Sequence, residues 1–212
     1  LITPLSALKM YREIIGSHTA DPESVIGFSQ KSLREIRRME AVACTLLKLA
    51  RLDAGMIQMQ KVPENIDTLM QDVLERFEVR AEQEGKVITL SGNRDVSLSC
   101  DALWISEAVG NIVKNALDHT GSGGRINISW EQGAIITKIV IEDNGTGICP
   151  EDLYNIFKRF YRSRFSQDTQ GIGLGLPLAK TIVELHGGTI SVASRLHTGT
   201  AFTLSFFHLT NE

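Results

Sequence analysis

The fold is decided by one stretch of the chain, Asn111-Ile112-Val113-Lys114-Asn115-Ala116-Leu117-Asp118-His119-Thr120. Apolar residues recur in it at helical spacing, which predicts the second half of a helix over 101–119. Glu107, Asn111, Asn115 and His119 are four residues apart and therefore line up along one face of that helix. A buried side-chain amide needs a partner, since leaving it unpaired costs roughly 1–3 kcal/mol. The polar stripe faces either water or a polar ligand, and the helix considered alone favours water.

Two glycine clusters further along the chain change that balance. Asp143-Asn144-Gly145-Thr146-Gly147 directly follows the apolar run 139–141, which is typical of a strand. Gly171-Ile172-Gly173-Leu174-Gly175 opens a predicted helix over 175–186. Glycines at a helix start allow backbone amides to approach phosphate. Either cluster alone is typical of a turn, but their order after the asparagine helix predicts a nucleotide site.

In this order the motifs resemble the catalytic domain of sensor histidine kinases, within the ATPase superfamily shared with DNA gyrase, mismatch-repair proteins and heat-shock chaperones. The stretch 111–120 is similar to the family's asparagine box, and 143–147 and 171–175 are similar to its first and second glycine boxes. Residues 156–162 resemble its phenylalanine box, and Gly199-Thr200 its last motif. The resemblance covers nearly the whole chain.

The resemblance implies a role for each polar residue in binding ATP and Mg²⁺. Asp143 would accept a hydrogen bond from the adenine amine, and Asn115 would give its amide oxygen to Mg²⁺, which prefers oxygen ligands. Asn111 and His119 would contact the phosphates or the Mg²⁺ shell, and Arg162 would reach the terminal phosphate. The remaining ATP-binding positions implied are Gly145, Gly147, Gly171, Gly173, Gly175 and Thr200.

Two further expectations concern the surroundings of this site. Residues 161–170 lack apolar periodicity and resemble the family's lid over the nucleotide, whereas Phe157 and Phe160 are predicted to be packing anchors. Asp118 stands where many relatives have a lysine, which argues against a direct phosphate contact there.

Asn111 separates the kinase interpretation from its alternatives. ATPases of the superfamily carry a glutamate at that position to activate water, and an amide cannot act as a general base near neutral pH. Phosphoryl transfer depends mainly on positioning and charge neutralisation and needs no such base. The sequence therefore favours a kinase over an ATP-hydrolysing clamp. A catalytically silent nucleotide-binding dimerisation module is the other alternative, which Arg162 and Asn115 oppose.

The start of the chain resembles the end of the phosphoacceptor box of these kinases. The acceptor histidine of the family lies four positions before Thr3, which places it upstream of Leu1, so this fragment alone is not expected to autophosphorylate. The resemblance implies that Thr3 orients water in a phosphatase reaction on the partner, the receiver domain of a response regulator. His18 is interpreted as a loop histidine rather than a substitute acceptor.

Residues 1–16 and 25–52 have apolar positions at helical spacing and predict a helical hairpin. One hairpin cannot bury both its faces, so we expect a homodimer joined as a four-helix bundle; the alternative is a hairpin packed on its own catalytic domain. The predicted domains are a dimerisation hairpin, 1–55, and an ATP-binding domain, 56–212.

Composition is consistent with this organisation. The net charge of −3 argues against a nucleic-acid partner, and no apolar run is long enough to span a membrane. We therefore expect a cytoplasmic fragment, with the full-length protein anchored in the inner or plasma membrane of a bacterium by an upstream segment. The three cysteines have no metal-like spacing.

The expected fold class is α+β, a two-layer sandwich of the Bergerat type in which three helices cover one face of a mixed sheet. Strands are predicted near 57–62, 87–91, 96–100, 125–131, 135–142, 189–194 and 201–208, and helices near 65–84, 101–119 and 175–186.

Overall fold

The structure is a computed structural model that describes residues 2–16, 21–163 and 171–208, and the side chains from residue 5 onward. The chain forms two compact units, residues 1–50 and 51–212. None of the described helices is both long and apolar enough to cross a lipid bilayer.

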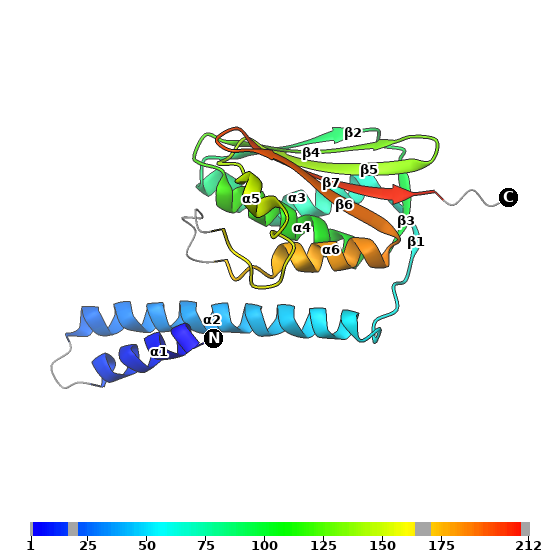
Figure 1. Cartoon of the computed structure of the whole chain (residues 1–212). Helices are drawn as coiled ribbons and strands as arrows, with labels where there is room; N and C mark the ends of the chain where they lie inside the picture. The colour runs from blue at the N-terminus through cyan, green and yellow to red at the C-terminus, as the bar shows by residue number, and fades with distance from the viewer. Residues whose placement is uncertain (1, 17–20, 164–170, 209–212) are drawn as a thin grey trace. The chain divides into compact units, whose positions relative to one another are not determined.

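The first unit is a helical hairpin of α1 (Ile2–Ile15) and α2 (Pro22–Asp53), whose last turn belongs to the second unit (Figure 1). Asp21 caps α2, because its carboxylate accepts from the backbone N–H of Ser24 at 2.9 Å and of Glu23 at 3.1 Å. The Ser24 hydroxyl also donates to it at 2.6 Å, and these bonds lower the pKa of Asp21. The rings of Tyr11 and Phe28, 5.7 Å apart, hold α1 against α2.

The second unit is a five-stranded sheet with three helices on one face, which confirms the predicted fold class (Figure 1). The strand order is β2-β4-β5-β7-β6, and only β2 and β4 among these described strands are parallel. The strands are β2 (Val87–Gly92), β4 (Arg125–Gln132), β5 (Ile136–Asp143), β6 (Gly188–Arg195) and β7 (Gly199–Phe207). The covering helices are α3 (Ile66–Gln83), α4 (Ala102–His119) and α6 (Gly175–Leu185).

Alternation along the strands produces the core between the two layers. Every second residue of β4, β5 and β7 points toward the helices and is almost fully buried, whereas the residues between them are partly exposed. On the helical side, the buried residues of α4 are Ile105, Ala108, Val109, Gly110, Ile112, Val113, Ala116 and Leu117. The polar stripe of α4 is thereby left on the side away from the sheet.

One predicted strand was wrong and one short helix was missed. The strand expected at 57–62 is instead β1 (Val62–Asn65), which pairs antiparallel with β3 (Ser97–Cys100) in a separate two-stranded sheet. Residues 57–60 do alternate between partly buried and exposed, but the N–H of Gln60 donates to the Asp101 carboxylate at 3.0 Å rather than to a strand. The missed helix is α5 (Pro150–Leu153). The other predicted strands and helices of this unit begin and end within two residues of their expected positions.

Candidate nucleotide-binding site

The polar stripe of α4 meets the start of α6. The amide nitrogen of Asn111 donates to the carbonyl of Glu107 at 2.9 Å, one turn back along the helix. Its amide oxygen faces the backbone of Gly175, where an added Cβ would lie 3.0 Å from it. The asparagine box and the second glycine box, which are more than 50 residues apart in sequence, are therefore in contact.

The N-terminus of α6 is a suitable anion site within this contact. Its N-cap residue is Leu174, which makes no side-chain hydrogen bond to the first turn. Backbone N–H groups at an uncapped helix start attract anions. A larger residue at Gly175 would push against Asn111, so glycine allows the two helices to approach.

The first glycine box is fastened to the other end of the stripe. Asp143, the last residue of β5, accepts from the N–H of Gly145 at 2.8 Å. The N–H of Thr146 donates to the carbonyl of His119 at 3.0 Å, and an added Cβ at Gly145 would lie only 2.3 Å from that carbonyl. Gly147 has φ +68° and would clash with the carbonyl of Arg195 if it carried a Cβ. The loop therefore holds Asp143 beside the C-terminal end of the stripe.

Asp143 is a buried carboxylate, with 6% of its surface exposed. Burial raises its pKa, while hydrogen bonds from the N–H groups of Gly145 and Thr200 and the nearby His119 act in the opposite direction. A ligand that donates a hydrogen bond to this carboxylate would offset the cost of burying it.

A serine that sequence reasoning missed lies beside Asp143 and Thr200. Asp143 pairs with Thr200 across β5 and β7, and Thr200 pairs with Ser194 across β7 and β6. The Ser194 hydroxyl accepts from the N–H of Ile148 at 2.8 Å, donates to the carbonyl of Gly199 at 2.9 Å, and lies 2.9 Å from the Thr200 hydroxyl. Alternation along β6 puts Ser194 on the partly buried side and Ser191 on the exposed side, but only strand pairing places Ser194 in this row.

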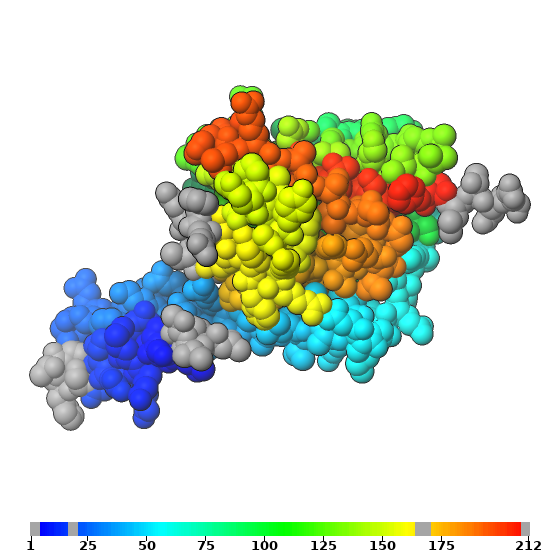
Figure 2. Space-filling model, viewed as in Figure 1, coloured from blue at the N-terminus to red at the C-terminus, as the bar shows by residue number. Residues whose placement is uncertain are grey.

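The described base of the lid is fixed to the second glycine box. The N–H of Phe160 donates to the carbonyl of Gly173 at 2.9 Å, and the Tyr161 hydroxyl donates to the Asp152 carboxylate on α5. Figure 2 shows the segment that contains α5 (yellow) beside α6 (orange). Arg162 is exposed at the end of this segment. Most of the predicted lid, residues 164–170, lies outside the described part of the chain.

The two phenylalanines of this segment differ. The ring of Phe157 packs edge-on against Phe202 at 6.3 Å, as expected for a packing anchor. The same prediction was wrong for Phe160, which is 59% exposed. Its backbone has φ +62°, in the left-handed region that residues other than glycine rarely adopt.

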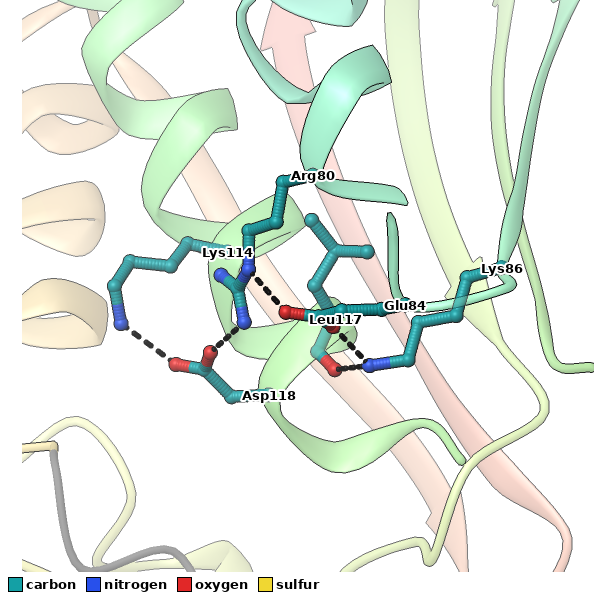
Figure 3. Close-up of polar contacts among 6 residues, drawn as sticks. All are labelled: Arg80, Glu84, Lys86, Lys114, Leu117 and Asp118. Atoms are coloured by element: carbon teal, nitrogen blue, oxygen red, sulfur yellow. Dashed lines mark hydrogen bonds and ion pairs between the residues drawn. The ribbon is translucent and has the colours of Figure 1, made fainter. Parts of the chain in front are cut away.

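Asp118 belongs to a charged cluster at the ends of α3 and α4 (Figure 3). Its carboxylate accepts from Arg80 at 2.6 Å and from Lys114 at 2.6 Å. Glu84 binds Arg80 at 2.7 Å and also pairs with Lys86, whose ammonium donates to the Leu117 carbonyl at 2.7 Å. Partial burial lowers the pKa of Arg80, but its bonds to Asp118 and Glu84 raise that pKa above its ordinary value.

The donor set suits Mg²⁺ only if phosphate completes it. Among the described residues, no three His, Cys, Asp or Glu side chains are grouped to hold a metal. Asn115 is half-exposed on the stripe, between Asn111 and His119. Mg²⁺ keeps several waters and otherwise binds phosphates with one or two protein ligands, so a lone amide oxygen beside an anion site fits it.

The predicted residues thus fall into two groups. The structure places Asn111 against Gly175 and His119 against Gly145 by direct contact, and Asp143 beside Thr200 by strand pairing. Thr3 lies in α1, in the other unit, and its side chain is outside the described part.

Residues 100–211 match the sequence profile of the histidine kinase-, DNA gyrase B- and HSP90-like ATPases. The chain belongs to this ATPase family. This assignment is consistent with the meeting of the asparagine helix and both glycine boxes in one place.

Relatives of this ATPase-family chain include sensor kinases. The chain is 36% identical over 195 residues to the sensor protein kinase PmrB of Pseudomonas aeruginosa. The matched region covers 92% of this chain and 40% of PmrB. The chain therefore spans less than half the length of that relative. Its fold is similar to the histidine kinase AdeS of Acinetobacter baumannii, with a TM-score of 0.82, 23% identity, and coverage of 99% of this chain and 96% of AdeS. The fold is also similar to that of the histidine kinase ThkA in complex with the response regulator protein TrrA, with a TM-score of 0.80 and 21% identity. The match covers 97% of this chain and 58% of the matched ThkA–TrrA chain.

Proposed function

We propose that this chain is the ATP-binding and dimerising part of a sensor histidine kinase, which transfers the terminal phosphoryl group of ATP to a histidine. The observation that carries the proposal is the contact between Asn111 on α4 and Gly175 at the uncapped start of α6. An amide, which is not a base, lies beside a helix N-terminus that attracts phosphate.

Each residue of the site would then bind or orient the nucleotide. Asp143 accepts from the adenine amine, in the row completed by Thr200 and Ser194. The first turn of α6 and the exposed Arg162 hold phosphate oxygens. Asn115 would hold Mg²⁺, which would supply neutralisation of the phosphate charge. Since Asn111 takes no proton from water, the phosphoryl group is kept for a better-placed nucleophile.

The proposed acceptor is a histidine four positions before Thr3, on the helical hairpin of a homodimer. From there the phosphoryl group passes to an aspartate of a response regulator, and Thr3 orients water in the reverse, phosphatase reaction. The ThkA–TrrA complex supports this choice of partner, since its kinase has a similar fold. The chain would work in the cytoplasm, with a membrane anchor elsewhere in the complete protein.

Labelling with γ-³²P-ATP tests the transfer. A chain extended upstream through the proposed histidine should acquire acid-labile phosphate, whereas the 212-residue chain should not. Labelling of the 212-residue chain itself would contradict the proposed acceptor.

Calorimetric titration tests the metal ligand. Asn115→Ala should lose the Mg²⁺-dependent part of ATP binding, because it removes the amide oxygen. Asn127→Ala is the matched control, since Asn127 accepts from Thr89 on the sheet at 3.1 Å. Equal Mg²⁺ dependence in Asn115→Ala and the control would place the metal ligand elsewhere.

A further inference from the structure

The acidic residue on the nucleotide-facing side of α4 presents an electrostatic problem for a site that binds a triphosphate. Asp118 is seven residues after Asn111, so two turns of helix bring it back to the same face. A carboxylate there would repel phosphates unless cations neutralise it.

The two carboxylate oxygens of Asp118 are held by different cations (Figure 3). Arg80, from α3, donates to Oδ1, and Lys114, one turn earlier on α4, donates to Oδ2, both at 2.6 Å. The Asp118 side chain is 17% exposed. Its charge is therefore shared between two partners, of which one would suffice to neutralise it.

The two cations are held with unequal strength. Arg80 is also bound by Glu84 at 2.7 Å, which keeps it in place. The side chain of Lys114 is 53% exposed, and its one ion-pair partner within the described part of the chain is Asp118. A pair four residues apart whose lysine is exposed is weak, and lysine before the acid is the less favourable order along a helix. Lys114 is therefore the cation that can leave.

The cluster around Asp118 also contains more cations than carboxylates. Its cations are Arg80, Lys86 and Lys114, and its carboxylates are those of Glu84 and Asp118, which leaves one positive charge in excess. Lys114 lies three residues after Asn111 and directly before Asn115. Its long, flexible stem allows the ammonium to act as a mobile point charge for phosphate.

We propose that Lys114 is a phosphate-binding residue of this site, held by Asp118 in the free protein and released to the ATP phosphates, while Arg80 keeps Asp118 neutralised. This inference rests on the proposed ATP binding. It adds a cation that the sequence did not identify, on the same helix as the asparagines.

Calorimetric titration of the whole chain with Mg-ATP and with adenosine tests this inference. Lys114→Met should weaken Mg-ATP binding about tenfold, since a charge-assisted hydrogen bond is lost, and leave adenosine binding unchanged. Lys114→Arg keeps the charge and should restore most of the affinity. Lys138→Met is the matched control, because Lys138 is 41% exposed and also pairs with a carboxylate, that of Glu131 on the sheet.

The possible results distinguish the role of Lys114 from the proposed function of the chain. If the wild-type chain binds Mg-ATP and Lys114→Met binds it with the same affinity, Lys114 does not bind phosphate. The proposed function would not be contradicted by that result. A parallel loss of Mg-ATP and adenosine affinity in Lys114→Met would also overturn the role of Lys114, since that pattern indicates a general disturbance of the site. Failure of the wild-type chain to bind either compound would overturn the proposed function itself.

Discussion

At the scale of one residue, the burial of Asp143 makes its ionised carboxylate costly for the stability of the fold. Burial raises its pKa above the ordinary value of 3.8, so the folded chain holds the proton more tightly than the unfolded chain does. Linkage then requires the free energy of unfolding to fall as the pH rises from that ordinary value through the folded pKa. Above this window, the ionised carboxylate lowers stability and is useful only when a ligand donates to it.

We therefore predict opposite effects of Asp143→Asn on binding and on stability. The amide oxygen can still accept from the N–H of Gly145, so thermal unfolding at neutral pH should show a chain at least as stable as the wild type. ATP affinity should fall by roughly 10- to 100-fold, because one acceptor for the adenine amine is lost. Unchanged affinity in a calorimetric titration would show that adenine binds elsewhere.

Ser194 is the other residue that we expect to matter. Ser194→Ala removes the acceptor of the Ile148 N–H and the neighbour of the Thr200 hydroxyl, and should destabilise the fold by about 1–3 kcal/mol. Ser191→Ala, on the exposed side of the same strand, should change the unfolding free energy by less than about 0.5 kcal/mol. Equal urea midpoints for the two variants would contradict the role assigned to Ser194.

At the scale of elements, one histidine ties the end of α6 to the start of α4. His186 accepts from the N–H of Asp101 at 3.1 Å through Nε2, so Nδ1 carries the proton and donates to the Ile182 carbonyl at 2.8 Å. Burial lowers the pKa of His186, and Lys61 acts in the same direction, while the bond to Ile182 and the charge of Asp101 oppose it.

This tie predicts a pH-dependent stability. Because the folded pKa lies below the ordinary 6.5, the unfolded chain binds the proton first as the pH falls. The stabilisation is complete above pH 6.5 and decreases as the pH falls from 6.5 through the folded pKa. In urea unfolding, the free energy of unfolding of the wild type should therefore exceed that of His186→Gln at pH 7.5, and the difference should shrink as the pH falls to 5. The chain's four other histidines are common to both proteins, so parallel curves would contradict the prediction.

Elements were predictable where local pattern and tertiary pairing agree. The helix 102–119 carries its own apolar periodicity and its cap, Asp101, so its ends could be read from the sequence. The strand expected at 57–62 has the right alternation, but a strand also needs a partner, and β3 pairs with 62–65 instead. Phe160 also has a tertiary feature that no local pattern reveals, because its N–H donates to the Gly173 carbonyl while its backbone is left-handed.

The site was predictable to the same extent. The order of the motifs predicted that Asn111, Asp143 and Gly175 bind the nucleotide. The structure shows which residues lie beside each of them. The roles proposed for Ser194 and Lys114 could not be predicted, because the first depends on the register of two strands and the second on Arg80, from a different helix.

At the scale of the whole molecule, the hairpin has an apolar surface suited to a second copy of itself. Ile26, Leu33 and Leu47 are 59%, 48% and 57% exposed, and they are separated by seven residues or a multiple of seven. This is the spacing of a helical seam. The proposed homodimer would cover it.

Leu33→Asp should therefore raise the dimer dissociation constant at least about tenfold, because a charge would replace a leucine that the proposed dimer buries. Sedimentation equilibrium measures this, with Val79→Asp as the control, since Val79 is 63% exposed on α3 of the other unit. A wild-type chain that stays monomeric at high concentration would contradict the dimer and favour a hairpin packed on its own catalytic domain.

The strand order has a consequence for the way the protein is made. β7 is the last of the described strands to be synthesised, yet it lies between β5 and β6. Until it leaves the ribosome, Asp143 lacks Thr200 and two strand edges have no neighbour. The hairpin, residues 2–53, emerges before the strands, and at about 5–20 residues per second the rest of these 212 residues follows over roughly 10 to 30 s. In the proposed homodimer, nascent chains would thus meet through their hairpins before either holds a nucleotide, and a chain cut short before residue 199 would keep the hairpin but lack the strand that brings Thr200 beside Asp143.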